Sequence, residues 1–446
     1  MIRLHIMLNN RRRFIFPAAM GAVLVLIAGS ANALAAPTVR CVPSASLNPS
    51  CTGSTTYPTI QKAVNAANDG DIIVVGPGYY NESVTINAAI TLLGAQAGND
   101  ARVDRHDPAK ESIVDATGKG SSALYVDEES VVIDGFTVEG AHSYGSPSPY
   151  PAGIYVGSYK YVQVLNNILQ NSSTGVYLYG AGQDVIEHNL FRNNNEGGEV
   201  DSGYGIFLNG VPYLVITENE FTGNKAAAIG SMNETQDASI TNNTSENDGS
   251  FVIFKDTYWT HFSNNHGKNF GHTGVLPVLP GPPPIYADAA VVIGPGNLFL
   301  VISNNDLEKG EAPISNGIAF TTVFGTSTAP NANWYLNVIN NKIERFPGNG
   351  IVAEEALVSS TPTGTLYGPG SFIVGNKVFD NGLDGIFIEG ASTYNSGIPL
   401  DDNEAEGNHV FDCHDTSTGT GTLGTGNTWL NNTGNLSYPT GLCTPR

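Results

Sequence analysis

Basic residues are scarce in this sequence, and their scarcity excludes one large class of partners. The chain has 20 lysines and arginines against 41 aspartates and glutamates, a formal net charge of −21 at pH 7. Because a protein that grips a phosphate backbone needs a basic surface, we expect no nucleic-acid partner. A polyanionic sugar chain is also disfavoured unless a cation bridges it, so calcium (Ca2+) stays a candidate cofactor.

Long apolar runs are equally rare. One extends from Phe14 to Ala28, directly after the arginines of residues 11–13, and is followed by the small-residue pattern Ala33-x-Ala35. This order predicts a secretory signal peptide at residues 1–36. Residues 11–15 (RRRFI) also resemble a twin-arginine export signal. Since no later stretch approaches ~20 consecutive apolar residues, we expect no membrane span after signal removal and a secreted or periplasmic location.

Cysteines are few and lie near the two ends of the exported chain. Cys41 and Cys51 form one close pair, and Cys413 and Cys443 form the other. Export permits disulfides, and neither pair has the spacing of a metal site. We therefore predict two disulfides, the first in an N-terminal segment at residues 37–57 and the second in a C-terminal cap at residues 412–446.

Helical periodicity is almost absent, and a repeat takes its place. Segments such as "GIYVGSYKYVQVLNNILQN" (153–171) and "GVYLYGAGQDVIEHNLFRN" (175–193) recur with a base period of 22 or 23 residues. Each unit contains three short strands with alternating apolar and polar residues, which cannot bury an apolar face alone. Stacked coils with parallel strands solve this problem, so we predict an all-β parallel β-helix over residues 58–443.

The repeat also contains an asparagine in each unit, at a turn between strands. Asparagine side chains stacked at one turn can hydrogen-bond to one another in a ladder. We interpret the members of this column as structural: Asn166, Asn189, Asn219, Asn242, Asn304, Asn340 and Asn376. Ahead of the first strands, Ile60, Ala63, Val64 and Ala67 have helical spacing, which predicts a short capping helix over residues 59–68.

The entry segment "NDGDIIVVGPGYYNESVTI" and the "GIxV…VxIxNN" units resemble the right-handed parallel β-helix proteins of the pectin-lyase-like superfamily. The resemblance covers about Tyr57 to Cys443 and implies the fold, not one chemistry, because this scaffold carries lyases, hydrolases, esterases and non-catalytic binders. The Gly78-x-Tyr80-x-Glu82 motif resembles pectin methylesterases, but no stretch matches their catalytic motifs, nor those of polygalacturonases. We interpret it as scaffold.

A resemblance to the copper-linked β-helix proteins of nitrous-oxide-reductase maturation would imply clusters of histidine and methionine. The nearest group in this sequence is His261, His266 and His272. Histidines in loops are more often solvated than bound to a metal, so the metal ligands stay unknown.

Insertions in the coils point to one face. Long insertions precede or follow the glycine-initiated first strand of several units, and such loops usually build the binding face of a solenoid. The outward residue of that strand is aromatic on consecutive coils, at Tyr155, Tyr177 and Phe207. Exposed rings would bind sugar rings, whereas buried rings would pack under a loop. Three tyrosines on the adjoining insertions favour a ligand: Tyr144, Tyr150 and Tyr204.

Two carboxylate clusters are candidates for chemistry. Glu354 and Glu389 each follow a strand glycine by four residues on neighbouring coils, with Glu355, Asp401 and Asp402 nearby. Stacked carboxylates would raise one pKa, as a glycosidase acid requires, or would together hold calcium; the alternative is an acidic surface patch. Glu196, Glu199 and Asp201, near the aromatic column, form a similar cluster.

These observations lead to one functional hypothesis and one rival. We expect a secreted, monomeric β-helix protein that binds extracellular polysaccharide or cell-wall material in a groove over the first strand of each coil. Degradation of that polysaccharide by a lyase or hydrolase reaction is a further expectation. The rival is a non-catalytic structural or cell-surface solenoid that recognises its partner by shape.

Overall fold

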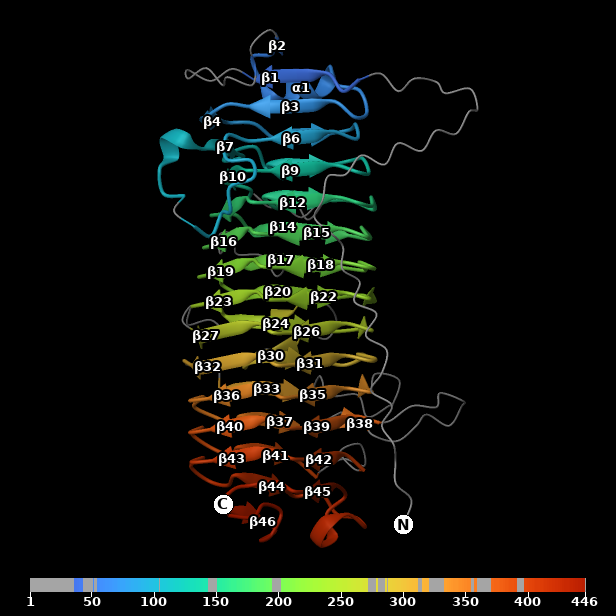
Figure 1. Cartoon of the computed structure of the whole chain (residues 1–446), viewed down its shortest axis with the longest axis vertical. Helices are drawn as coiled ribbons and strands as arrows, with labels where there is room; N and C mark the ends of the chain where they lie inside the picture. Colours follow the sequence, from blue (N-terminus) through green and yellow to red (C-terminus); the bar gives the residue numbers. More distant parts are fainter. Residues whose placement is uncertain are drawn as a thin grey trace, which may run out of the picture. The chain divides into compact units, whose positions relative to one another are not determined.

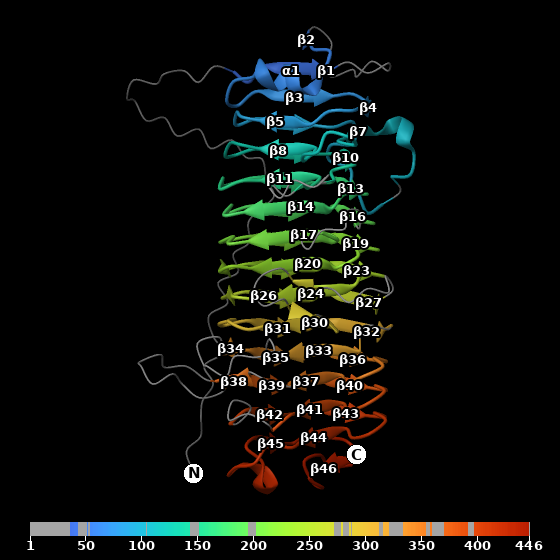
Figure 2. The same ribbon diagram turned by 180° about the vertical axis from the view of Figure 1, so that it is seen from behind.

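The computed structural model describes residues 36–42, 51, 54–103, 105–142, 151–194, 202–271, 278–279, 285–286, 288–311, 315–320, 333–353, 357–358, 370–390 and 397–445. Within Pro37–Arg446, which forms one contact unit, the chain winds repeatedly through three parallel sheets, here called A, B and C (Figures 1 and 2). Successive strands such as β3, β4 and β5 belong to A, B and C in turn. This is the right-handed parallel β-helix that the repeats predict.

Sheet A contains fifteen strands in this spatial order: β2 (Thr55–Thr56), β1 (Val39–Val42), β3 (Ile72–Val75), β6 (Thr91–Leu93), β9 (Val132–Asp134), β12 (Gln163–Leu165), β15 (Val185–Glu187), β18 (Val215–Thr217), β22 (Ser239–Thr241), β26 (His261–Ser263), β31 (Val301–Ser303), β35 (Asn337–Ile339), β39 (Phe372–Val374), β42 (Pro399–Asp401) and β45 (Thr428–Leu430). Sheet B contains twelve: β4 (Gly78–Tyr80), β7 (Ser112–Asp115), β10 (Phe136–Glu139), β13 (Ile168–Gln170), β16 (Leu190–Arg192), β19 (Glu220–Thr222), β23 (Thr244–Glu246), β27 (His266–Phe270), β32 (Asp306–Gly310), β36 (Lys342–Glu344), β40 (Lys377–Phe379) and β43 (Glu404–Glu406).

Sheet C contains thirteen strands, taken here in chain order: β5 (Val84–Ile86), β8 (Leu124–Val126), β11 (Ile154–Val156), β14 (Thr174–Tyr179), β17 (Tyr204–Asn209), β20 (Ala227–Met232), β24 (Ser250–Phe254), β30 (Ala289–Ile293), β33 (Asn316–Phe320), β37 (Ile351–Ala353), β41 (Ile386–Ile388), β44 (Cys413–Asp415) and β46 (Ser437–Tyr438). Three small pairs complete the strands: β21 (Thr235–Gln236) with β25 (Thr257–Tyr258), β28 (Val278–Leu279) with β29 (Ile285–Tyr286), and β34 (Asn333–Trp334) with β38 (Leu357–Val358).

The alternation of the strands divides apolar side chains between two clusters. The inward residues of all three sheets, such as Ile154, Val164 and Leu169, form a continuous buried core inside the coils. A second buried cluster lies on the outer face of sheet C and includes Tyr155, Tyr177 and Ile253. Sheet C is therefore apolar on both faces.

The predicted asparagine ladder exists, but its register differs from the sequence prediction at four positions. In each ladder step, the Oδ1 atom of one asparagine accepts hydrogen bonds from the backbone N–H and the Nδ2 of the preceding coil's asparagine, as Asn243 does for Asn219 (3.0 and 3.1 Å). The buried members are Asn167, Asn189, Asn219, Asn243, Asn265, Asn305, Asn341, Asn376, Asn403 and Asn432.

The four misassigned asparagines, Asn166, Asn242, Asn304 and Asn340, each precede a ladder member and have φ between 52° and 57°. Asparagine tolerates this left-handed conformation better than most residues do, so both halves of each Asn-Asn pair are structural, for different reasons.

The entry motif is structural as predicted. The one α-helix in the described residues, α1 (Ile60–Asn65), is shorter than the predicted span and buries Ile60, Ala63 and Val64. The Glu82 carboxylate accepts hydrogen bonds from the backbone N–H groups of Ile60 and Gln61 (3.0 and 3.1 Å), which caps the helix. The Tyr80 hydroxyl donates to the Gly76 carbonyl (2.8 Å). The glutamate and tyrosine of "GPGYYNES" thus fix the first coil.

Both predicted disulfides form, Cys41 with Cys51 and Cys413 with Cys443. Two 3-10 helices, η2 (Pro108–Lys110) and η4 (Thr422–Gly424), lie near opposite ends of the solenoid. Among the described residues, no helix has the length and apolar character needed to cross a membrane.

The connection from β6 to β7, residues 94–111, leaves the regular path and is called the strap. It contains η2 and runs beside the coils in Figure 1. The strap is anchored by Arg105, whose buried guanidinium pairs with Glu111 and donates to the backbone carbonyls of Asn166 and Phe136. The backbone N–H of Ala101 donates to the His188 carbonyl (3.1 Å). Residues from the second coil therefore reach the turns of later coils.

Candidate functional site

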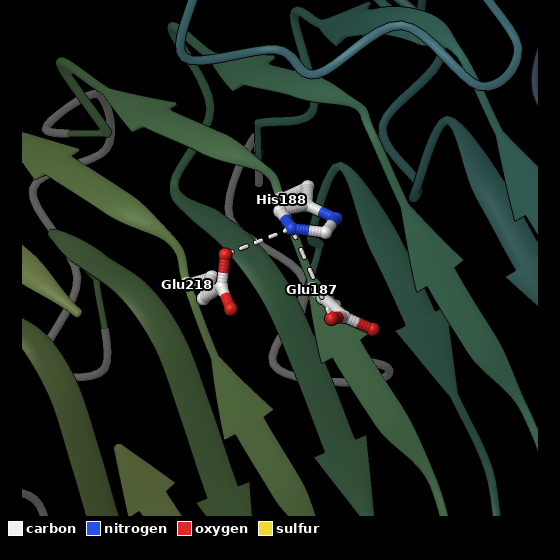
Figure 3. Close-up of side chains that lie close together, drawn as sticks. All are labelled: Glu187, His188 and Glu218. Atoms are coloured by element: carbon white, nitrogen blue, oxygen red, sulfur yellow. Dashed lines mark hydrogen bonds and ion pairs between the residues drawn. The ribbon is translucent and has the colours of Figure 1, made fainter. Parts of the chain in front are cut away.

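Glu187, His188 and Glu218 gather at the turn between sheets A and B (Figure 3). Glu187 is the last residue of β15, and His188 follows it in the left-handed conformation (φ 56°). Glu218 follows β18 in the same conformation (φ 52°), one coil further along. Because the His188 backbone N–H donates to the Glu218 carbonyl (3.1 Å), the ladder of coils itself aligns these side chains.

The side-chain atoms of this cluster are close enough to share one cation. The Nε2 of His188 lies 3.0 Å from the Oε2 of Glu218 and 3.9 Å from the Oε1 of Glu187. One ligand atom from each residue lies within 4.8 Å of the others. All three side chains are partly exposed, so an ion could reach them from solvent.

The strap brings further charges to the cluster. Arg102 lies 3.4 Å from Glu218 and binds Asp100 through two guanidinium nitrogens. Although burial alone would raise the pKa of Asp100, the hydrogen bonds from Arg102 hold that pKa below its usual value. Burial raises the pKa of the neighbouring Glu220, and Arg102 partly offsets this rise. The positive charge of the Arg102 guanidinium therefore already lies beside the cluster.

This arrangement can act in two ways. As an ionic clasp, it ties the strap to two coils through Arg102, Glu218 and His188. As a metal centre, it offers one imidazole nitrogen and two carboxylates, a donor set that suits Zn2+ or Cu2+. The sequence prediction missed it. The available signal was that His188 and Glu218 interrupt a turn position that the neighbouring coils fill with Asn166, Asn242 and Asn264.

The predicted aromatic column lies where the sequence placed it, on consecutive outward positions of sheet C. Tyr155 pairs with Tyr177, and Tyr177 pairs with Phe207. The ring centroids of these neighbours lie 5.4 and 5.2 Å apart, and Tyr125 extends the stack at 5.1 Å. The side chains are buried, with exposed fractions of 9% for Tyr155 and 1% for Tyr177 and Phe207. Of the two expectations, the packed state is the one present, and a binding role stays a prediction.

The outward column continues beyond Phe207 along sheet C. Its next members are Gly230, Ile253, Val292, Ala319, Val352, Phe387, His414 and Tyr438. Tyr125 and Phe387, towards opposite ends of the apolar column, are partly exposed. Tyr204, predicted to support a ligand, is fully buried against Phe207.

Three of the predicted carboxylates, Glu389, Asp401 and Asp402, lie among the described residues. Glu389 directly follows β41 of sheet C. Asp401 is the last residue of β42 in sheet A, and Asp402 follows it. Glu389 begins the turn that precedes this strand, so the length of β42 separates the two aspartates from that turn. Several predicted residues lie outside the described residues: Tyr144, Tyr150, Glu196, Glu199, Asp201, His272, Glu354 and Glu355. His261 and His266 belong to different sheets, A and B.

A histidine–aspartate pair that the sequence prediction missed joins His414, on the coil after Glu389, to Asp384, on the same coil as Glu389. The Nδ1 of His414 lies 2.8 Å from the Oδ2 of Asp384, whose Oδ1 accepts from the Phe411 backbone N–H (2.9 Å). The imidazole stacks on Phe387 with a centroid distance of 4.5 Å. Asp384 thereby fixes the orientation of an imidazole on the outer face of sheet C.

The long insertions border sheet C. Residues 140–153, 193–203 and 271–288 connect strands of sheet B to sheet C, and residues 321–336, 354–371 and 389–398 connect sheet C to sheet A. The prediction that the insertions flank the first strand of the repeat is confirmed by this topology.

Comparisons with known proteins agree with the fold. Residues 66–271, less than half of the chain, match a family described as periplasmic copper-binding protein (NosD). A cell surface glycoprotein of Methanothermus fervidus is 27% identical over 131 residues, which are 29% of this chain and 18% of that protein. The match thus spans under a fifth of that relative.

Solved structures share the architecture at low sequence identity. The catalytic unit of a GH87 α-1,3-glucanase from Streptomyces thermodiastaticus superposes with a TM-score of 0.60 and 13% identity, covering 85% of this chain and 66% of that chain. The periplasmic alginate epimerase AlgG gives a TM-score of 0.48 and 13% identity, covering 82% of this chain and 77% of that chain. At 13% identity, the likeness to the glucanase shows the fold alone.

Proposed function

We propose that this exported β-helix protein binds extracellular polysaccharide along the outer face of sheet C. The observation that carries the proposal is that the long insertions enter or leave the strands of this one sheet, whose outward column is apolar and aromatic. Such faces, bounded by loops on a rigid solenoid, are the usual binding surfaces of repeat proteins. The α-1,3-glucanase catalytic unit with this fold acts on a polysaccharide, which supports the same class of partner here.

The test is a binding assay with a panel of plant, algal and bacterial polysaccharides, each measured with calcium and with chelator. Tyr125→Ala and Phe387→Ala remove rings from the partly exposed parts of the column, and Tyr155→Ala with Tyr177→Ala removes its buried centre. The matched control is Tyr79→Ala, because Tyr79 is 61% exposed on sheet B. We expect weaker binding from the column variants only. Unchanged affinity for every polymer in all column variants would refute the groove.

The proposal includes degradation of the bound chain, with Glu389 as a catalytic acid together with Glu354, which lies outside the described residues. His414, which lies on the next coil and is oriented by Asp384, adds a second proton-transfer group near Glu389. Absorbance at 235 nm would report β-elimination and new reducing ends would report hydrolysis. If neither signal appears while binding is retained, the result would favour the rival hypothesis of a non-catalytic surface solenoid.

A second candidate function is metal binding at Glu187, His188 and Glu218, which the match to a copper-binding family favours. The donor set fits Cu2+ rather than Cu+, because the sequence beyond residue 36 contains one methionine, Met232, and all four cysteines form disulfides. Titration of the purified protein with Cu2+, followed by electron paramagnetic resonance, would test it. We expect His188→Ala to abolish a site that His261→Ala retains; no saturable site in the parent would refute the function.

A further inference from the structure

One turn of the coil carries aromatic residues in a backbone conformation that rarely accommodates them. The turn from sheet C to sheet A contains, on successive coils, Ser130, Tyr161, Gln183, Tyr213, Asp237, Trp259, Phe299 and Tyr335, each with φ between 49° and 61°. Backbone hydrogen bonds align the row from Ser130 to Trp259, because the N–H of each of these residues donates to the turn of the next coil, as Tyr213 does to Gln236 (2.9 Å).

The two other turns of the coil show that this choice of residues is not imposed by the fold. At the A–B turn the left-handed position is mostly asparagine or glycine, as at Asn166, Asn242 and Gly375. The B–C turn follows the same rule, as at Asn171, Asn193 and Gly223. The row from Ser130 to Tyr335 contains neither residue, although bulky side chains in this conformation are genuine outliers. Conformational preference therefore does not explain the aromatic residues.

Three of the five aromatic members of the row are open to solvent and regularly spaced, whereas Phe299 is half-buried and Tyr335 is 4% exposed. Tyr161, Tyr213 and Trp259 are 50%, 58% and 44% exposed, unlike the buried column on sheet C. They occur on every second coil, which separates them by roughly 10 Å, twice the spacing of adjacent strands. The exposed polar residues Gln183 and Asp237 occupy the intervening coils. Phe299 and Tyr335 continue the row behind Trp259, with ring centroids 5.9 and 4.5 Å apart.

We infer that this row is a binding edge for a neutral, extended polysaccharide. Ring surfaces contact the apolar C–H faces of pyranose rings, and the glutamine and aspartate between them supply hydrogen-bonding groups for hydroxyls. A regular spacing along the axis suits a polymer with its own repeat better than a small solute or an irregular protein surface. The net charge of −21 makes an anionic polymer the unfavourable occupant. The inference rests on the proposed function and gives it a second, exposed surface and a substrate class.

The test replaces Tyr213 and Trp259 by asparagine, the residue that the other turns prefer. Because asparagine relieves the left-handed strain, the double variant should melt at or above the parent's temperature. Affinity for insoluble neutral polymers, namely cellulose, chitin and β-1,3-glucan, should nevertheless fall at least about tenfold for the polymer that the parent binds. Tyr213→Phe with Trp259→Phe should retain binding, and Tyr79→Ala is the exposed-tyrosine control.

The outcomes separate this inference from the proposed function. If the parent binds a neutral polymer and the asparagine double variant binds it equally well, the row is not the binding site. The sheet C face would then remain as the proposed surface. Equal binding of the parent to alginate and to the neutral polymers would overturn the substrate class. A parent that binds none of the polymers would overturn both proposals.

Discussion

The asparagine ladder predicts a large difference between two substitutions only 23 residues apart, Asn219→Ala and Asn242→Ala. Asn219 is fully buried, and its Nδ2 donates to the carbonyls of Ile186 and Thr217 (both 2.9 Å). Its Oδ1 accepts from the backbone N–H and the Nδ2 of Asn189 (both 3.0 Å). Asn242 is an exposed left-handed residue, and the backbone hydrogen bond that it donates to Ser263 survives in the alanine variant.

The magnitudes follow from the groups that each variant leaves without partners. Alanine at position 219 leaves the buried backbone N–H of Asn189 without an acceptor and removes one hydrogen bond from each of the carbonyls of Ile186 and Thr217. Each such loss costs about 1–3 kcal/mol. We expect a decrease of about 4 kcal/mol in the free energy of unfolding. Alanine at position 242 loses only the asparagine preference for positive φ, about 1 kcal/mol.

Guanidinium chloride melts of both variants, followed by far-UV circular dichroism, measure the difference. Comparable denaturant slopes are required for the comparison, because a solenoid can unfold in parts. If Asn219→Ala is no less stable than Asn242→Ala, the ladder does not contribute as its hydrogen bonds indicate. Asn242→Gly is a second control, since glycine adopts positive φ freely.

Three further predictions concern other parts of the scaffold. Burial raises the pKa of Asp248 from 3.8 to about 7, so folding favours the protonated form and the free energy of unfolding should fall as pH rises towards and through 7. In melts at pH 4 to 8, Asp248→Asn should reduce this dependence of stability on pH. An unchanged dependence would contradict the prediction. Replacing Arg105 by alanine should lower stability by about 3–5 kcal/mol, because it leaves Glu111 buried without its charge partner. The more exposed Arg102→Ala should lower it by about 1 kcal/mol or less. Equal losses in urea melts would refute the larger contribution of the buried Arg105–Glu111 ion pair. Removing the Cys413–Cys443 disulfide, with its sequence separation of 30, should lower stability by roughly 3–4 kcal/mol in thermal or denaturant melts, and a variant as stable as the parent would show that the C-terminal coils need no staple.

The fold could be predicted because it is periodic, and the errors occur where periodicity is ambiguous. Paired asparagines such as Asn242 and Asn243 offer two registers for one ladder, and only the structure shows which residue is buried. The outward direction of Tyr177 follows from strand alternation. Its burial does not follow from alternation, because that pattern predicts the direction of a side chain and not how closely its neighbours pack around it.

The surroundings of the Glu187–His188–Glu218 cluster could not be predicted, for a related reason. The two coils that supply it are adjacent in the repeat, so their proximity could be inferred. The strap that brings Arg102 has no repeat of its own, and its path depends on particular contacts such as the buried guanidinium of Arg105. Non-periodic segments thus decide what surrounds a site on a periodic scaffold.

Aspartates in the amide ladders have a separate physical meaning. Each asparagine both accepts and donates along the ladder, so the last member needs only to accept. Asp248 takes the N–H and Nδ2 of Asn224, and Asp412 does the same for Asn408 while its second oxygen accepts two backbone N–H groups. Asp288 accepts from the Nδ2 of Asn316. A carboxylate at a ladder position therefore marks where a ladder ends, and it should not be read as a catalytic acid from sequence alone.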